Sequence, residues 1–204
     1  MASRRTSSRP PPRPPRRRWW WLALLAVVLL VVLVARVAGR QQQPVSANSG
    51  AAHGQTVDDI PCATMEQVSY LVHAHLAIFV TGQTQVVPYG IGIVGPWKVQ
   101  QSAEGPFVTA GSCFYWLHTH TADGIIHIEA PTPQSFTLGQ FFDVWGQPLG
   151  PTQVGSARGP VIATVNGQRF SGNPRAIPLG NHDLIQLDVG QEVPPQPFTF
   201  PSGL

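Results

Sequence analysis

Five of the seven histidines in this 204-residue chain fall in three short segments with the same internal spacing. In a β-strand, residues i and i+2 point to the same face. Imidazole nitrogens and carboxylate oxygens are good ligands for Zn²⁺, Cu²⁺, Fe²⁺ and Mn²⁺. The spacing therefore predicts a transition-metal site built on strand faces. The candidate ligands are three i, i+2 pairs: His73 and His75, His118 and His120, and His127 and Glu129.

The turn between the second and third pairs predicts how they face one another. Asp123-Gly124 is typical of a two-residue type I′ turn between two strands. In that register His120 lies opposite His127, and His118 lies opposite Glu129, with all four side chains on one face. A three-residue loop would instead put the last two on the opposite face. We favour the two-residue turn, because it separates these polar side chains from a largely apolar second face.

The ligand types favour Zn²⁺ or Cu²⁺ over Cu⁺, because a thioether site is improbable in a chain whose only methionines are Met1 and Met65. A closed ligand shell would indicate metal handling or metal-dependent assembly. An open coordination position would indicate a metal-dependent hydrolase or oxidoreductase, with Glu129 or Glu66 as a general base. Catalytic residues are not assigned by the sequence.

Other interpretations of the histidines remain open at this point. The alternatives are a polar network without metal, a histidine-based pH sensor or proton relay, and a non-catalytic surface interaction module. His53 precedes the folded part of the chain and His182 falls in a turn, so neither is expected to be a ligand. Asp123 is interpreted as a turn residue. Bound metal would separate these hypotheses.

Cys62 and Cys113 are the only cysteines of the chain. On the oxidising side of a membrane, two cysteines most simply form one disulfide. The alternative is that both thiolates bind a metal ion. We expect the disulfide, which would join the segment before His73 to the segment before His118.

The first forty residues predict a membrane anchor. Trp19–Ala35 is an unbroken apolar run, and Arg36 can snorkel, so a transmembrane helix is expected over residues 19–38. The arm of residues 1–18 carries seven arginines, which places it in the cytoplasm. A cleaved signal peptide, cut after about Gly39, is the alternative. The expected localisation is the cell membrane, with a single pass into the lipid bilayer and the C-terminal part extracytoplasmic.

Charge divides the chain at the same place. Nine of the 13 lysines and arginines lie within residues 1–40, whereas all ten acidic residues lie beyond them. The remainder is therefore acidic, which argues against a nucleic-acid partner. Residues 39–59 are polar and small and predict a flexible stalk. Residues 60–204 form the expected extracytoplasmic β-rich domain.

Hydrophobic patterns place strands through that domain. Two hairpins and two later strands are expected from β-branched runs and from turn sequences. A Gly-Gln motif follows a strand twice, in residues 76–83 and 161–168, as a faint internal repeat. The expected strands are His75–Val80, Gln85–Ile93, Tyr115–Thr121, Ile125–Ala130, Val161–Val165 and Leu184–Val189. The Pro- and Phe-rich tail from Val193 is expected to lie extended over the domain.

Two helices are expected beside these strands. Residues 137–146 carry apolar side chains at spacings of three and four, with Thr137 as N-cap and Gly146 as terminator. A weaker pattern, with a capping box from Thr64, predicts a short helix through about Leu71. One main helix on a sheet predicts an α+β fold, and we expect a β-grasp-like arrangement.

The segments HAHLAIFVTGQ, YWLHTHTADGIIHIEAP and FTLGQFFDVWGQPLG together resemble a group of uncharacterised prokaryotic proteins, membrane-anchored or secreted. Those proteins carry a similar LHTH…GIIHIE…TLGQFF signature. The resemblance covers roughly residues 60–200. It implies a domain family with an extracytoplasmic setting, and it implies no reaction.

Overall fold

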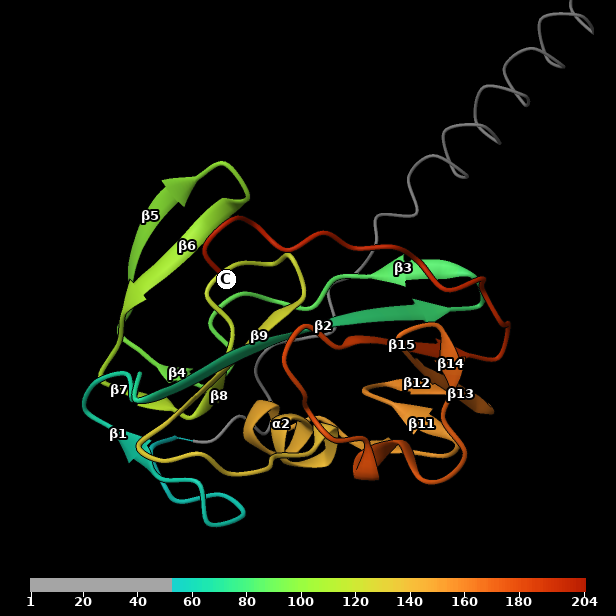
Figure 1. Ribbon diagram of the computed structural model, residues 1–204, viewed down its shortest axis with the longest axis horizontal. Coiled ribbons are helices and arrows are strands. Elements are labelled where there is room, and N and C mark those ends of the chain that lie inside the picture. The colour runs from blue at the N-terminus through green and yellow to red at the C-terminus, as the bar shows by residue number, and fades with distance from the viewer. Residues whose placement is uncertain (1–52) are drawn as a thin grey trace, which may run out of the picture. The chain divides into compact units, whose positions relative to one another are not determined.

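The computed structural model describes residues 53–204, and these form a β-rich domain (Figure 1). Strands account for 41% and helices for 7% of the structure. The expected α+β class and the β-grasp-like arrangement are therefore wrong, because the one α-helix of the described domain is small beside its sheets. The predicted arm (1–18) and transmembrane helix (19–38), with most of the stalk (39–59), lie outside the described residues. Within residues 53–204, no helix is long and apolar enough to cross a membrane.

A seven-stranded mixed sheet is the centre of the domain. Its longest strand, β2 (Tyr70–Val80), lies between β15 and β9. The β15–β2 pair is parallel, and the other pairs of this sheet are antiparallel. The sheet also contains β3 (Gln83–Gln85), β8 (Leu117–His118), β9 (Ile125–Ala130), β13 (Val161–Val165), β14 (Gln168–Arg169) and β15 (Leu184–Val189). The predicted bounds of β9, β13 and β15 are confirmed.

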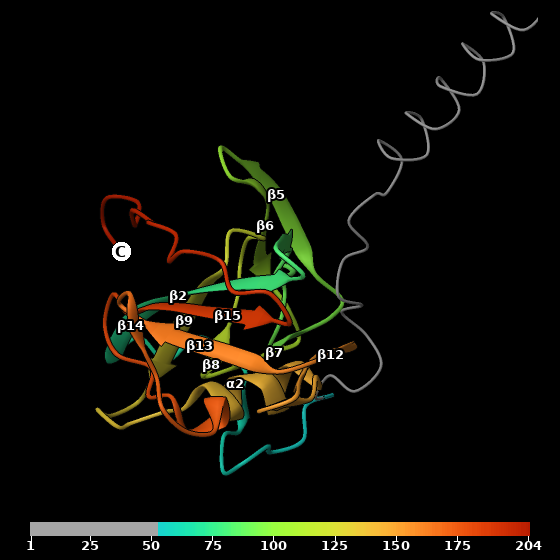
Figure 2. The same cartoon turned by 90° about the vertical axis from the view of Figure 1, so that its right-hand side faces the viewer.

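Helix α2 (Leu138–Trp145) packs apolar side chains into the main core, as predicted from its spacing. Thr137 caps its start in a capping box with Gln140, and Gly146 ends it in the left-handed conformation at φ 69°. A 3₁₀ turn, η1 (Pro174–Ala176), lies beside it. Figure 2 shows α2 below the central sheet and the β5–β6 hairpin rising on the other side.

The sequence repeat corresponds to two hairpins of the same kind. Thr81 and Gly82 join β2 to β3 with φ values of 49° and 79°. Asn166 and Gly167 join β13 to β14 with φ values of 52° and 76°. Positive φ at both central residues is the geometry of a type I′ turn, which glycine and asparagine adopt most readily. The predicted strand Gln85–Ile93, in contrast, forms only the ends of β3 and β4.

Smaller sheets complete the domain. One of them contains β1 (Cys62–Ala63), β7 (Cys113–Tyr115) and β4 (Ile93–Val94), and it holds the predicted disulfide between Cys62 and Cys113. The Cα atoms of the two cysteines are 5.4 Å apart. The other small sheets are a hairpin of β5 (Lys98–Ser102) with β6 (Gly105–Ala110), and a meander of β10 (Leu149–Gly150), β11 (Gln153–Val154) and β12 (Ala157–Arg158).

The short helix expected from Thr64 to about Leu71 does not form. Residues 64–69 are turns and irregular chain, and β2 begins at Tyr70. Met65 is 66% exposed and Val68 is 61% exposed, so the apolar side chains of that pattern find no core to cover. An isolated helix this short is unstable in water without packing, and pairing of the first residues of β2 with β9 prevails.

Candidate metal centre

Alternation along the central strands gives the sheet one apolar and one polar face. Ile126 and Ile128 on β9 point into the core that α2 covers, so His127 and Glu129 point to the opposite face. His118 on β8 lies directly opposite His127. On the other side of β9, His73 of β2 is also opposite His127. The predicted sharing of one face by these side chains is confirmed.

The predicted register is wrong by two residues. His118 pairs with His127, whereas the two-residue turn would have paired His118 with Glu129. The strand ends early because Thr119 leaves the ladder: its N–H donates to Ile91 O, and its hydroxyl donates to Pro88 O. An even shift leaves every side chain on its predicted face. His120 therefore lies beyond the end of β8, in the loop that precedes β9.

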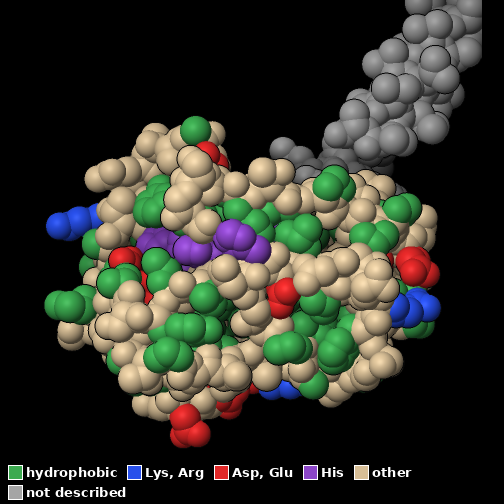
Figure 3. Space-filling model, in the orientation of Figure 1, with side chains coloured by type: hydrophobic (Ala, Val, Ile, Leu, Met, Phe, Trp, Pro, Cys, Tyr) green, Lys and Arg blue, Asp and Glu red, His purple; other side chains and the backbone are tan. Residues whose placement is uncertain are grey.

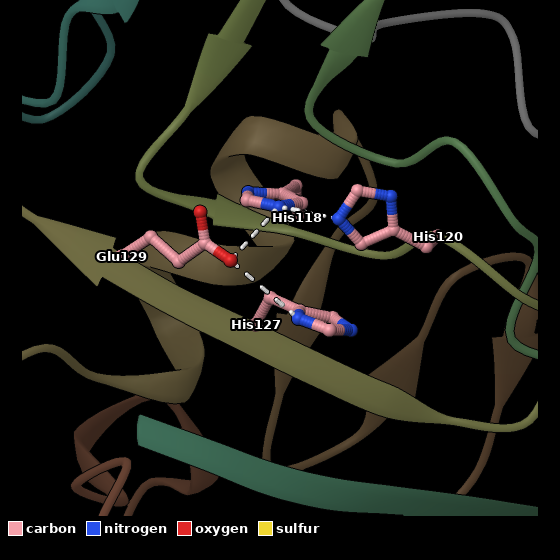
Figure 4. Close-up of side chains that lie close together, drawn as sticks. All are labelled: His118, His120, His127 and Glu129. Carbon is pink, nitrogen blue, oxygen red and sulfur yellow. Dashed lines mark hydrogen bonds and ion pairs between the residues drawn. The ribbon is translucent and has the colours of Figure 1, made fainter. Parts of the chain in front are cut away.

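Four of the six predicted ligands converge on this face (Figure 4). Each offers one ligand atom, and the four atoms all lie within 4.8 Å of one another. Nε2 of His118 is 3.1 Å from Nε2 of His120 and 3.8 Å from Oε1 of Glu129. Nδ1 of His127 is 3.6 Å from the same oxygen. All four residues are buried.

Backbone carbonyls fix the tautomers of two of these histidines. Nδ1 of His118 is 2.8 Å from Tyr115 O, and Nδ1 of His120 is 2.6 Å from Val108 O. A carbonyl only accepts hydrogen bonds, so both Nδ1 atoms carry the proton and donate it. In neutral rings this leaves lone pairs on both Nε2 atoms, which face each other at 3.1 Å. Two acceptors at that distance require a cation or an added proton between them.

Glu129 has an incomplete set of partners. Its Oε1 approaches His118 and His127 at 3.8 and 3.6 Å, which is too long for a hydrogen bond. Its Oε2 is buried and has no hydrogen-bond partner. A buried carboxylate without donors is costly, because desolvation is not offset by hydrogen bonds. The position of Glu129 thus also favours a positive charge within the cluster.

Burial shifts the protonation of the site toward uncharged groups. It lowers the pKa values of His118 and His127 well below their usual range, and the neighbouring histidines add to this effect. Burial also raises the pKa of Glu129, against the influence of His120. The pKa of Glu66 is raised by burial and then by the negative charge of Glu129. His118 and His127 are therefore neutral at pH 7, which is the state that binds metals.

An open pocket of about 380 Å³ gives access to the cluster. His120, His127 and Glu129 line it, whereas His118 lies fully buried behind them. Glu66 stands on the pocket wall with Oε1 3.5 Å from Nε2 of His120. The rest of the wall consists of Val68, Leu71, His73, Phe107, Thr109 and Leu204. A small ion can reach the cluster from solvent by this route.

Two predicted ligands lie outside the group of four. His75 is turned away: its Nε2 is 3.1 Å from Asp123 O, and its ring stacks on Phe198 at 3.7 Å. His73 lies next to the cluster, with its ring edge-on to His127 and the centroids 4.7 Å apart. The two histidines that were not expected to be ligands, at positions 53 and 182, are exposed and do not belong to the group.

The β5–β6 hairpin supplies parts of the site that the sequence did not predict. Val108 of β6 provides the carbonyl that orients His120, and Phe107 stacks on the same imidazole with the centroids 4.6 Å apart and the planes 9° apart. The available signal was a β-like run on either side of Glu104-Gly105. Strand patterns alone do not indicate which distant side chain a hairpin will cover.

Comparison with known proteins does not place the chain in a family. No protein-family model, curated protein or solved structure matches it. The chemistry of the centre therefore has to be inferred from its four side chains, their partners and the pocket beside them.

Proposed function

We propose that this protein binds a transition-metal ion through His118, His120, His127 and Glu129. The observation that carries the proposal is the pair of facing Nε2 lone pairs on His118 and His120. Each ring is oriented by a backbone carbonyl behind it, which is the usual arrangement of metal-binding histidines. Hydrogen bonds to groups outside the ligand cluster thus hold both rings in the tautomer that can bind a metal ion.

A proton in place of a metal ion is the main rival. It would turn His120 into an imidazolium that donates to His118, with Glu66 beside it. A proton joins only two atoms, however, and Glu129 would remain too far from both neighbouring histidines to accept a hydrogen bond. One metal ion among the four ligand atoms accounts for His127 and Glu129 as well.

The ligand types suit Zn²⁺ or Cu²⁺, and the spacing fits the tetrahedral shell of Zn²⁺. A tetrahedral ion with bonds of about 2.0–2.1 Å holds its ligand atoms about 3.3 Å apart. Three of the six separations, at 3.1, 3.6 and 3.8 Å, lie close to that value, and all six are within 4.8 Å. Thiolates do not compete, because Cys62 and Cys113 are joined to each other. Three imidazoles and one carboxylate match the borderline preferences of these two ions.

A metal-dependent enzyme is the second candidate function, and the pocket favours it. Three of the four ligands line an opening of about 380 Å³, so a small molecule could approach an ion held there. A structural site is closed by four protein ligands, whereas a catalytic site keeps one position open, so this candidate function requires that one of the four side chains does not bind the ion. A bound ion in such a position supplies Lewis-acid chemistry or an activated water molecule. The hydrolase and oxidoreductase alternatives both require this access.

The proposed setting is the outer side of a membrane, reached through an anchor at residues 19–38. The support for it is the arginine-rich arm followed by an apolar run. A disulfide between Cys62 and Cys113 agrees with an oxidising compartment. A site exposed there would take its metal from the surroundings of the cell, which suits metal handling or metal-dependent assembly.

Metal content and titration test the proposal. Full-length protein purified without chelators should contain Zn²⁺ or Cu²⁺, or take up one equivalent in a calorimetric titration of the apo form. His118→Ala and His127→Ala should each abolish stoichiometric uptake, whereas His53→Ala, at an exposed position, should not. Absence of uptake by the wild-type protein at micromolar metal would favour the polar network instead.

A further inference from the structure

Histidines occupy one line across four neighbouring segments of the central sheet. His118, His127 and His73 lie opposite one another on β8, β9 and β2. The backbone N–H of His182, just before β15, donates to the carbonyl of His73 at 2.6 Å and so continues the line. Figure 3 shows histidine side chains in one row on the surface of the molecule. The line runs from a fully buried residue at one end to an exposed residue at the other.

Within this line, His73 has a buried ring nitrogen that neither forms a hydrogen bond nor belongs to the proposed ligands. Its side chain is buried, and its Nε2 has no hydrogen-bond partner. It lines the same pocket as three of the proposed ligands, and its ring is edge-on to His127. It is nevertheless outside the group of four converging ligand atoms. A buried imidazole nitrogen without a partner, in a residue that lines the pocket beside the metal centre, is placed to bind an ion in transit.

His182 does not line that pocket itself but contacts its wall through Leu204. Its Nε2 is 3.0 Å from the carbonyl of Leu204, a residue of the pocket wall, and its ring stacks on Phe200 at 4.4 Å. Because a carbonyl only accepts, Nε2 carries the proton and the lone pair is on Nδ1. His182 therefore offers an exposed nitrogen ligand one strand away from the unpartnered nitrogen of His73.

We propose that His182 and His73 form an acquisition site, which captures the metal ion at the pocket wall and passes it to the buried centre. The proposal rests on the proposed metal-binding function and adds the route of loading. The ion exchanges one ligand at a time, releasing water as imidazole nitrogens replace it. Because the acquisition residues are not ligands in the final state, they change how fast the ion arrives and leaves, and not how tightly it is held.

His75 provides a matched control. It is two residues from His73 on the same strand, and it stacks on Phe198 of the C-terminal tail much as His182 stacks on Phe200. It lines a different pocket and takes no part in the line of histidines. Replacing it removes a half-buried imidazole and a contact with the tail, without changing any residue of the proposed route.

The test compares rates with affinities. Stopped-flow mixing of apo protein with Zn²⁺ gives the loading rate, and excess chelator gives the release rate, for wild type, His73→Ala, His182→Ala and His75→Ala. A second variant, His73→Leu, keeps the buried volume filled, and thermal unfolding of each apo protein checks its fold. Loading and release should both slow on the order of tenfold in the first two variants, because the ion loses its raised effective concentration near the centre. The equilibrium dissociation constant and the His75→Ala rates should stay at wild-type values.

Three other results are possible, and each would contradict the proposal in a different way. Unchanged rates in folded His73 and His182 variants would overturn the acquisition site while leaving the centre itself intact. A large loss of equilibrium affinity in His73→Ala or His73→Leu would make His73 a permanent ligand, which also contradicts the proposal. If wild-type protein takes up no Zn²⁺, the metal centre fails and the route fails with it.

Discussion

Replacing His118 with leucine should remove metal binding while preserving the fold. In the metal-free protein, Nε2 of His118 faces another nitrogen at 3.1 Å and has no favourable hydrogen bond to lose when both rings are neutral. The substitution does remove the bond from Nδ1 to Tyr115 O. Loss of a hydrogen bond that leaves a buried carbonyl unpaired costs about 1–3 kcal/mol. The leucine fills most of a site that is fully buried.

The substitution should also remove most of the stabilisation that bound metal gives to the folded protein. At about 100 times the wild-type dissociation constant, a ligand that binds only the folded state stabilises it by about 2.7 kcal/mol. Residues that merely orient ligands change metal affinity about 10–100-fold, so loss of a ligand should weaken it by at least about 100-fold. The metal-dependent stabilisation of His118→Leu then falls to about 0.4 kcal/mol or less.

Urea unfolding with and without Zn²⁺ measures both quantities. Wild type, His118→Leu and the exposed-site control His53→Ala are compared at one free metal concentration, and His120→Leu serves as a second ligand variant. Wild type and His53→Ala should gain about 2.7 kcal/mol, whereas both leucine variants should gain almost nothing. A full metal-dependent gain in His118→Leu would show that the ion binds elsewhere, and the explanation from facing lone pairs would be refuted.

Three further predictions concern the rest of the chain. Replacing both Cys62 and Cys113 with alanine should lower the free energy of unfolding by about 4 kcal/mol, because the disulfide closes a loop with a sequence separation of 51; a loss below about 1 kcal/mol in urea unfolding would contradict this. The pKa values of His118 and His127 are depressed in the folded protein, so the unfolded chain binds more protons below its usual histidine pKa of 6.5. The free energy of unfolding of the metal-free protein should therefore stay constant above about pH 6.5 and fall at lower pH, by up to about 1.4 kcal/mol per pH unit for each histidine. A free energy of unfolding that does not change between about pH 7 and 5 would argue against neutral buried rings. Protease added to intact cells should remove the C-terminal domain and spare the arm that precedes residues 19–38, whereas a mature chain beginning near residue 40 would exclude the anchor.

The alternation of side chains along a strand explains why the sequence could predict which residues form the site. The side chains of His118, His127 and Glu129 share a face because i, i+2 spacing and an even register shift both preserve it. The same local rules gave helix α2, whose capping box and left-handed Gly146 are short-range features. The disulfide was predictable because the chain has only two cysteines.

Local patterns failed where packing partners decided the outcome. The capping-box pattern from Thr64 predicted a helix, but strand pairing extends β2 back to Tyr70. The turn at Asp123-Gly124 predicted a tight hairpin, but hydrogen bonds from Thr119 to a distant segment end β8 at His118, three residues before the expected end at Thr121. The fold class was wrong for a related reason, since short strands of two or three residues carry little periodicity of their own.

By itself the sequence determined which residues could bind a metal ion and which of them share a strand face, because side-chain direction in a strand depends only on position along the chain. Only the tertiary structure decided which four converge. His75 contacts Asp123 O and Phe198 instead of the cluster, whereas the carbonyl of Val108 orients His120, a loop residue, toward it. Those partners are distant in sequence or belong to irregular chain. Their positions follow from the packing of the whole domain, which no local spacing encodes.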